Sequence, residues 1–250
     1  MKVEIGIKET AIVVAVFLCA LAAACFLASR PAEIASSLKP AACTANPAQS
    51  EIVLPSPNRT GLALEEAIAK RRSVRDFSGE SLTLGEVSQI LWAGQGITDR
   101  AGGFRSAPSA GALYPIELYL VPNRVEGAGC GIYRYVPEGH RLVLVRNGTF
   151  GQELAKAAYG QSPVGDAAAV VVLTAIPART AAKYGDAQAE RFIDIEAGHI
   201  SQNMLLEAVS LGLGAAPIGG FSQEEADAVL GIDGKNEKAV YLAIIGKPEK

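Results

Sequence analysis

A basic run at residues 71–75 contains the first side chains whose types and spacing suggest chemistry. Arg71, Arg72 and Arg75 place three guanidinium groups within five residues, and Ser73 lies among them. Guanidinium forks match the geometry of phosphate oxygens, and a serine hydroxyl adds a further donor. The run therefore indicates a site for a phosphate group. The alternative is a solvated basic helix end, because arginine also stabilises the C-terminus of a helix.

Two later segments consist mainly of small residues that allow a ligand to approach the backbone. Segment 105–115 (RSAPSAGALYP) leads into an apolar stretch, and its Ser109 can donate to a carbonyl edge. Segment 215–221 (AAPIGGF) contains Gly219 and Gly220, whose N–H groups suit a ring that gains negative charge on reduction. The alternatives are a plain loop and a turn that ends a helix. The sequence has neither a G-x-G-x-x-G nor a GxxxxGK[ST] fingerprint, so a Rossmann or P-loop site lacks support.

Lys183 and Tyr184 form the pair best suited to move a proton. A lysine acts as a base only if burial or a neighbouring cation lowers its pKa from about 10.4. Tyr184 could then orient a substrate or relay the proton; the alternative is a surface lysine beside a structural tyrosine. Gln202 and Asn203 could reach a ligand carbonyl or cap a buried network, and His199 is expected to be a hydrogen-bonded core histidine.

Hydrophobic periodicity predicts the elements that position these residues. Stretch 167–175 is continuously apolar and rich in valine, which predicts a strand buried on both faces. Helices and strands interleave, so the class is α/β or α+β with a sheet covered by helices. The predicted helices are 62–70, 82–93 (capped by Ser81 or Thr83) and 189–213, and the predicted strands are 116–121, 131–135, 141–145, 167–175 and 239–245.

The overall composition excludes several function classes. The chain has 250 residues, with 23 basic and 26 acidic side chains and a net charge of -3. No long run of either sign occurs, so we expect no nucleic acid partner. The four cysteines form no Cys-x-x-Cys pair and the two histidines are far apart, so we expect no metal site.

The N-terminal quarter differs from the rest of the chain. Residues 10–28 are 19 residues without a charge, close to the roughly 20 that a membrane span needs and more than a signal peptide's apolar region needs. An uncleaved anchor, a cleaved signal or lipoprotein segment, and a buried helix all remain open. Prolines recur through 29–60, which indicates a tether. We therefore expect a polar segment at 1–9, an anchor or signal at 10–28, a tether at 29–60 and a domain at 61–250. The protein would be membrane-anchored or exported in a bacterium, on an undetermined side of the membrane.

Four segments, taken in order, resemble one family. KRRSVRDF, APSAGALYPIELYLV, AAKYGDAQAERFIDIEAGHISQNMLLEAVSLGLGAAPIGGF and LAIIGKP are similar to the nitroreductase-like flavoproteins, and within them to the SagB-type dehydrogenase or thiazole/oxazole oxidase branch. The resemblance covers about three quarters of the chain.

The resemblance implies an α+β, three-layer α/β/α fold with a mostly antiparallel sheet, and FMN at the interface of a homodimer. By resemblance, the FMN phosphate and ribityl chain contact the basic run and a C-terminal lysine, the second subunit lays its small-residue loop against the ring, and Gly219 and Gly220 lie near N5. The implied binding residues are Arg71, Arg72, Ser73, Arg75, Pro108, Ser109, Ala110, Gly111, Gln202, Asn203, Gly219, Gly220 and Lys247. Lys183 and Tyr184 resemble the pair that assists proton removal in azoline oxidases.

The function expected from this resemblance is an FMN-dependent oxidoreductase that transfers hydride through flavin N5. The reductant would be NAD(P)H or a quinone-linked donor, and the substrate a small molecule or a peptide. One alternative is azoline-to-azole oxidation of peptides. Another is a membrane-tethered flavin-binding sensor or electron carrier.

Overall fold

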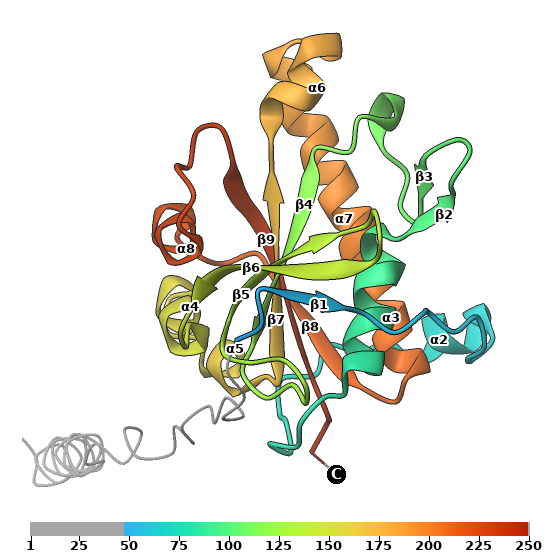
Figure 1. The fold of residues 1–250 in the computed structure, drawn as a ribbon, viewed down its shortest axis with the longest axis vertical. Helices are drawn as coiled ribbons and strands as arrows, with labels where there is room; N and C mark the ends of the chain where they lie inside the picture. Colours follow the sequence, from blue (N-terminus) through green and yellow to red (C-terminus); the bar gives the residue numbers. More distant parts are fainter. Residues whose placement is uncertain (1–47, 250) are drawn as a thin grey trace, which may run out of the picture. The chain divides into compact units, whose positions relative to one another are not determined.

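A single seven-stranded sheet organises the domain. The computed structural model describes residues 48–249, and its strands lie in the order β1-β6-β5-β4-β7-β9-β8 (Figure 1). Every neighbouring pair is antiparallel. The strand bounds are β1 Glu51–Val53, β4 Ile116–Pro122, β5 Gly131–Val136, β6 Arg141–Asn147, β7 Ala169–Ala175, β8 Gly214–Ile218 and β9 Lys238–Gly246, with a separate hairpin of β2 Ile97–Asp99 and β3 Phe104–Arg105.

Helices cover both faces of the sheet. They are α2 Leu64–Lys70, α3 Leu84–Gln95, α4 Gly151–Ala157, α5 Ser162–Asp166, α6 Pro177–Tyr184, α7 Asp186–Ser210 and α8 Gln223–Leu230. Side chains alternate across each strand, so Leu118 and Leu120 of β4 join the core beneath α3 and α7, whereas Tyr119 and Val121 join the core beneath α4, α5 and α8. These two cores confirm the predicted three-layer α+β architecture.

The long or strongly periodic predicted elements are confirmed. Helix α3 begins at a capping box, in which Thr83 accepts from the backbone of Glu86 while the Glu86 carboxylate accepts from the backbone of Thr83. Strand β7 is buried along its whole length, as its valine run predicts. Several short elements were not predicted; segment 215–221, for which a helix-ending turn was the alternative to a ligand-binding segment, begins in strand β8. Its GAAPI sequence is too short and too small-sided to show a strand pattern.

The predicted tether is wrong at its C-terminal end. Residues Glu51–Val53 form β1, which pairs with β6 and places Ile52 opposite Leu142. Ile52 and Leu54 are both buried, and the backbone of Asn58 donates to the side chain of Gln89. These apolar side chains fix the segment to the domain despite the prolines that follow. The predicted polar segment, the apolar stretch 10–28 and most of the tether lie outside the described residues.

The membrane prediction finds no support in the described part of the chain. Between residues 48 and 249 no helix is both long enough and apolar enough to cross a bilayer. The longest, α7, spans 25 residues but carries charged side chains along its exposed face.

Candidate functional site

The basic run 71–75 lies along the free edge of the sheet. Strand β8 is the last strand of the sheet, and Ser73 forms a parallel bridge with its Ala215. The backbone N–H of Val74 donates to the carbonyl of Ala215 at 3.0 Å. The structure therefore brings together two segments that the sequence had singled out separately. We call residues 71–75 together with β8 the arginine edge.

The arginines of this edge have different surroundings. Arg72 donates to the carbonyls of Ala69 and Arg71 at 3.1 and 2.7 Å, so it caps the last turn of α2, in agreement with the helix-end alternative. Within residues 48–249 the side chains of Arg71 and Arg75 form neither a hydrogen bond nor an ion pair. Two guanidinium groups are thus available for a ligand at this edge.

The predicted C-terminal lysine continues the same edge. The backbone N–H of Ser78 donates to the carbonyl of Lys247 at 3.0 Å, and Phe77 bridges to Pro248. The Lys247 ammonium lies 4.0 Å from the Glu80 carboxylate and is one third exposed. At that distance and exposure the pair is weak, so the lysine remains available to an anion.

Gly219 and Gly220 follow β8 directly and are both exposed. The carbonyl of Gly220 accepts from the Gln161 amide at 2.8 Å, whereas the N–H groups of both glycines donate no hydrogen bond within the described chain. A Cβ atom at Gly219 would come no closer than 3.4 Å to any other residue, and one at Gly220 no closer than 3.8 Å. The protein's own packing therefore does not demand glycine here, and the space beside the two N–H groups is open to a ligand.

The small-residue loop and the Lys–Tyr pair also meet. Gly111 adopts a φ of 65°, and a Cβ atom there would lie 2.9 Å from the Tyr184 hydroxyl and 3.0 Å from the Lys183 ammonium. Ser109 accepts from the backbone N–H of Tyr114 at 2.9 Å, which closes the loop on itself. We call residues 108–111 the serine loop; in this structure it lies against the end of α6.

Lys183 and Tyr184 lie in the last turn of α6. The Tyr184 ring packs edge-on against Phe192, with 4.9 Å between centroids, and the Lys183 ammonium lies 5.4 Å from the Tyr184 ring centroid. The Lys183 side chain is exposed. Residues 48–249 therefore do not supply the desolvation that a lysine base requires, and that desolvation has to come from a ligand or a second chain.

The remaining predicted residues lie on α7. The Asn203 amide donates to the carbonyl of Ser106 at 3.3 Å, so it holds the stretch that precedes the serine loop. Gln202 is exposed and faces away from that contact. His199 is exposed as well, so the prediction of a core histidine is wrong; its neighbours Gly198 and Gln202 show that this face of α7 is turned outward.

Sequence reasoning missed Glu196, a buried acid on α7 beneath the serine loop. Its residue is 2% exposed, and Oε1 has no hydrogen-bond partner within the described residues. Burial raises the pKa of the Glu196 carboxyl, while the neighbouring Ser109 and Gln95 side chains partly oppose that rise. The sequence does contain an indication of this buried acid, because Glu196 interrupts the apolar face of the helix that Ile193, Ala197 and Ile200 form.

The two groups of candidate residues lie at opposite ends of α7. Gly111 of the serine loop and Lys183–Tyr184 lie beside the start of α7 and Ser109 lies beside its Glu196, whereas residues 71–75 lie beside β8, the strand that follows the last residues of α7 (Figure 1). A helix of 25 residues is about 37 Å long. One chain therefore presents two incomplete groups rather than one assembled site. Within the described residues there is also no cluster of three or more possible metal ligands.

Comparison with known proteins identifies the class to which this fold and these residues belong. The model of the nitroreductase family matches residues 68–247, and the chain belongs to that family. A "putative nitroreductase" from Methanocaldococcus jannaschii is 42% identical over 191 residues, which cover 76% of this chain and 94% of that protein. The chain is thus a nitroreductase-family oxidoreductase.

Two further similarities refine this placement. The structure of a "putative nitroreductase" from Ralstonia eutropha matches with a TM-score of 0.72 and 28% identity, covering 82% of this chain and 94% of that one. A trifolitoxin-processing protein of Rhizobium leguminosarum bv. trifolii is 26% identical over 152 residues, which are 58% of this chain and 40% of that protein. The second similarity agrees with the SagB-type branch.

These similarities also correct the predicted location. The Methanocaldococcus and Ralstonia proteins are matched over 94% of their length, so almost all of each corresponds to this domain. Together with the finding that no membrane-spanning helix occurs in residues 48–249, this contradicts the prediction of a membrane-anchored or exported protein. That prediction rested on the apolar stretch 10–28, which lies outside the described residues.

Proposed function

We propose that this protein is an FMN-dependent oxidoreductase that carries hydride from a reductant to an acceptor. The observation that carries the proposal is the arginine edge. There, two guanidinium groups that form no hydrogen bond or ion pair within residues 48–249 lie beside the start of β8, and the two glycines that follow β8 have N–H groups that donate no hydrogen bond within the same residues. Phosphate at one end and an anionic ring edge at the other would complement these donors.

The chain's own residues fit such a ligand. Arg71, Arg75 and Lys247 would hold the phosphate, with the Ser73 hydroxyl as a further donor. The N–H groups of Gly219 and Gly220 would stabilise negative charge on the ring. When bound, FMN supplies two-electron chemistry by accepting and giving hydride at N5. The protein's contribution is to bind and orient the reactants and to keep water away from them.

A homodimer would complete the site. Since the serine loop lies at the far end of α7 from the arginine edge, a second copy related by a two-fold axis is needed to place its loop beside the first copy's edge. The surface offers apolar residues for such contact: Leu64 and Ile68 on α2 are 60% and 55% exposed, and Ile195 on α7 is 44% exposed. The proposed interface would remove these apolar side chains from water.

In this arrangement Lys183 and Tyr184 would face the reactants of the neighbouring edge. Closure of the interface would remove water from the Lys183 ammonium, which the single chain leaves exposed. A desolvated lysine holds its proton less tightly and can accept one from a substrate carbon. The adjacent Tyr184 hydroxyl, next to Gly111, would position the group that loses the proton.

The purified full chain tests the proposal directly. It should be yellow, show the absorption bands of oxidised FMN and lose that colour when mixed anaerobically with NADH, NADPH or a quinol. Sedimentation should give the mass of two chains. A colourless protein that takes up no added FMN would reject the proposed function, and a flavin-loaded monomer would reject only the dimer.

A second candidate, oxidation of azoline rings in peptides, is favoured by one similarity. The trifolitoxin-processing protein matches 58% of this chain, and the Lys–Tyr pair that resembles the pair of azoline oxidases lies beside Gly111 of the serine loop. Mass spectrometry of azoline peptides incubated with the protein should show the loss of two hydrogens per ring. Lys183→Ala should abolish that loss while flavin stays bound; unchanged turnover in the variant would remove the lysine from this role.

A further inference from the structure

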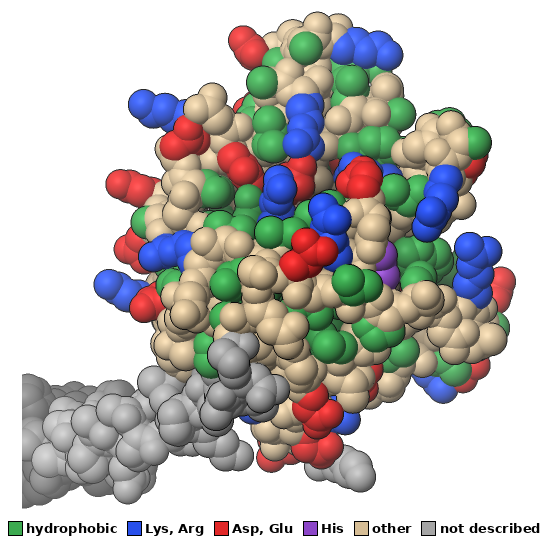
Figure 2. All heavy atoms as spheres, in the orientation of Figure 1, with side chains coloured by type: hydrophobic (Ala, Val, Ile, Leu, Met, Phe, Trp, Pro, Cys, Tyr) green, Lys and Arg blue, Asp and Glu red, His purple; other side chains and the backbone are tan. Residues whose placement is uncertain are grey.

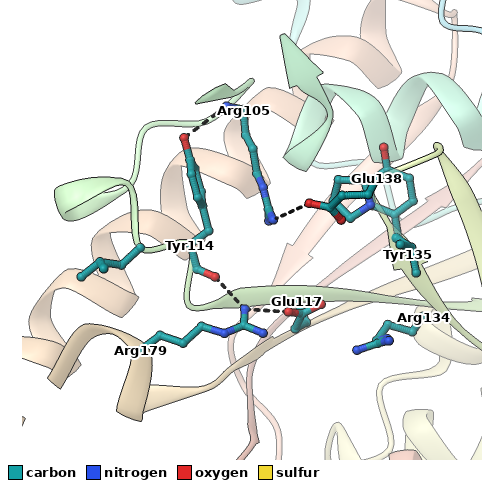
Figure 3. Close-up of a pocket in the computed structure, with 10 residues that line it drawn as sticks. Arg105, Tyr114, Glu117, Arg134, Tyr135, Glu138 and Arg179 are labelled. Atoms are coloured by element: carbon teal, nitrogen blue, oxygen red, sulfur yellow. Dashed lines mark hydrogen bonds and ion pairs between the residues drawn. The ribbon is translucent and has the colours of Figure 1, made fainter. Parts of the chain in front are cut away.

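A pocket of about 350 Å³ opens beside the serine loop, away from the arginine edge. Its walls are formed by Arg105 of β3, the loop residue Tyr114, strands β4 and β5, the turn after β5, and helix α6 (Figure 3). Its volume lies at the lower end of the range for small-molecule sites. Its lining is mainly polar and charged, unlike the apolar lining typical of such sites, so a charged ligand would suit it better than an apolar one.

Three arginines and two glutamates line this pocket, which leaves it with a positive excess. Arg179 is paired with Glu117 at 2.6 Å, and Arg105 lies 3.6 Å from Glu138. The side chain of Arg134 forms no ion pair or hydrogen bond within the described residues. In the space-filling view basic and acidic side chains alternate over the visible face without a large field of one sign, so this excess is local (Figure 2).

Arg105 is incompletely paired for a guanidinium so well shielded from water. Its side chain is 15% exposed, whereas its acidic neighbour Glu138 is 67% exposed and lies beyond normal hydrogen-bond length. Its remaining hydrogen bond and ring contact involve neutral groups, namely the Gln95 amide oxygen at 3.1 Å and the Tyr114 ring with 4.5 Å to the centroid. The buried Glu196 carboxyl interacts with it electrostatically but forms no ion pair with it within the described residues. A guanidinium removed from water gains most from a bidentate anion, and the fork is turned toward the pocket (Figure 3).

Tyr114 fixes two of these arginines in place. Its ring stacks on Arg105, its hydroxyl accepts from the backbone of Arg105 at 3.2 Å, and its carbonyl accepts from Arg179 at 2.8 Å. It does so with a φ of 47°, which a tyrosine rarely adopts. Strain of this kind is retained where surrounding contacts impose it, and it occurs often at ligand sites. The two cations are therefore held in position before any ligand arrives, which lowers the entropy lost on binding.

The pocket adjoins the proposed reaction centre. Arg179 and Lys183 lie four residues apart on α6 and so project from the same face of the helix. Tyr114 follows the serine loop, whose Gly111 approaches both Lys183 and Tyr184. A molecule held in the pocket by one end would extend its other end along this face toward the Lys–Tyr pair.

We propose that this pocket is a subsite for a carboxylate or phosphate group of the substrate or reductant, held by Arg105, Arg134 and Arg179. This inference rests on the proposed function, because it names the class of molecule that would reach the same centre. Two sources share this chemistry: the carboxylate of a small acceptor and a phosphate of a nicotinamide dinucleotide.

Arg134 provides the cleanest variant, because its side chain forms no hydrogen bond or ion pair within the described chain that the substitution would break. Equilibrium dialysis of the full chain, as purified, would measure binding of 4-nitrobenzoate, its neutral analogue 4-nitrobenzamide, and NADPH. Arg134→Gln should weaken binding of at least one of the two anions about tenfold, the effect of losing one charge-assisted hydrogen bond, and should leave the neutral amide within twofold. Arg134→Glu should weaken it further.

Arg100→Gln is the matched control, because Arg100 is an exposed arginine in the turn between β2 and β3 and does not line the pocket. Weakened 4-nitrobenzoate binding alone would identify an acceptor carboxylate, and weakened NADPH binding alone a dinucleotide phosphate. Unchanged binding of both anions in the two Arg134 variants would overturn the proposal. So would an equal loss in Arg100→Gln, or an equal loss for the amide. Dialysis does not depend on bound flavin, so a colourless protein would refute the proposed function while the subsite is still tested.

Discussion

The arginine edge and the serine loop hold their candidate residues in different ways. At the edge the backbone is ordinary and joined to β8 by one bridge, and the Arg71 and Arg75 side chains have no partner in the described chain. At the loop, Gly111, Ala112 and Tyr114 all have positive φ values, of 65°, 55° and 47°. Hydrogen bonds from Tyr114 to Ser109 and from Arg179 to Tyr114 hold that conformation.

The difference indicates which region depends on a ligand. Contacts within the chain hold the loop in its strained conformation, so the loop is preorganised before a ligand binds. The free-energy cost of that conformation is therefore part of the free energy of folding. The edge gathers like charges that only an anion can satisfy. Changes at the edge should therefore alter cofactor affinity with little effect on folding, whereas changes at the loop should alter stability and rate.

The largest expected effect is at Lys183, in the group beside the loop. Lys183→Ala should lower kcat by about 10²- to 10⁴-fold, the usual contribution of one acid–base group, while the flavin content stays that of the wild type. Anaerobic stopped-flow kinetics and the ratio of flavin to protein absorbance measure the two quantities. Loss of flavin would instead assign Lys183 to cofactor binding, and an unchanged rate would make it a surface lysine.

The second-largest effect is expected at the arginine edge, where a substitution should change the affinity for FMN and leave the stability of the fold almost unchanged. Arg75→Ala should weaken FMN binding about 10- to 100-fold, because one charge-assisted hydrogen bond contributes roughly 1.5–3 kcal/mol. The free energy of unfolding of the flavin-free protein should change by less than about 0.5 kcal/mol, since the side chain makes no contact to lose. Fluorescence titration and urea denaturation measure the two effects.

Arg72→Ala is the contrasting variant at the same edge. Arg72 donates to two carbonyls at the end of α2, so its loss should lower the free energy of unfolding by about 1 kcal/mol even without flavin. If Arg75→Ala unfolds the protein as readily as Arg72→Ala does, the distinction between a cap and a ligand-binding arginine is wrong.

How much of the fold and of the candidate site the sequence predicts depends on how far apart in the chain the interacting residues lie. Helix α7 and strands β4, β7 and β9 were predicted because their periodicity extends over seven or more residues. Strand β8, helix α6 and the hairpin of β2 and β3 are short and carry small or mixed residues, so no periodic signal reveals them. The FMN residues were selected singly or by resemblance; that the basic run lies on β8 follows from the Ser73–Ala215 bridge, which no local pattern predicts.

The arginine pocket shows the same limit. Arg105, Arg134 and Arg179 come from strand β3, strand β5 and helix α6, and their meeting depends on the pairing of β4 with β5 and with β7. Glu196 is the opposite case, since an acid on the apolar face of a predicted helix is visible in the sequence. Its position beneath the serine loop, however, depends on tertiary packing.

Glu196 provides a test through the pH dependence of stability. Burial raises the pKa of this carboxyl above its value of 4.5 in the unfolded chain, so the folded state favours the protonated form. Its stabilising contribution is complete below pH 4.5 and is lost as the pH rises through the folded-state pKa. Glu196→Gln stays neutral, so relative to the wild type it should gain stability as the pH rises through the folded-state pKa of Glu196. Urea denaturation at several pH values measures the gain; a difference independent of pH would show that the carboxyl is already ionised in the fold.

The smallest effect tests the strain itself. Ala112 has a φ of 55°, a backbone conformation that favours glycine over alanine. Ala112→Gly should therefore raise the free energy of unfolding by about 0.5 kcal/mol. The relief of strain would be larger, but the greater freedom of glycine in the unfolded chain partly offsets it. Ala110, two residues earlier, does not have a positive φ, so Ala110→Gly should instead lower the free energy of unfolding by roughly 0.5–1 kcal/mol. Opposite signs at these two neighbouring alanines, measured by urea denaturation, would establish that the loop carries its strain within one chain. Equal losses at both would mean that the Ala112 methyl group contributes more to stability than the positive φ costs. The contrast between a preorganised loop and a ligand-dependent edge would then rest on the side-chain hydrogen bonds alone.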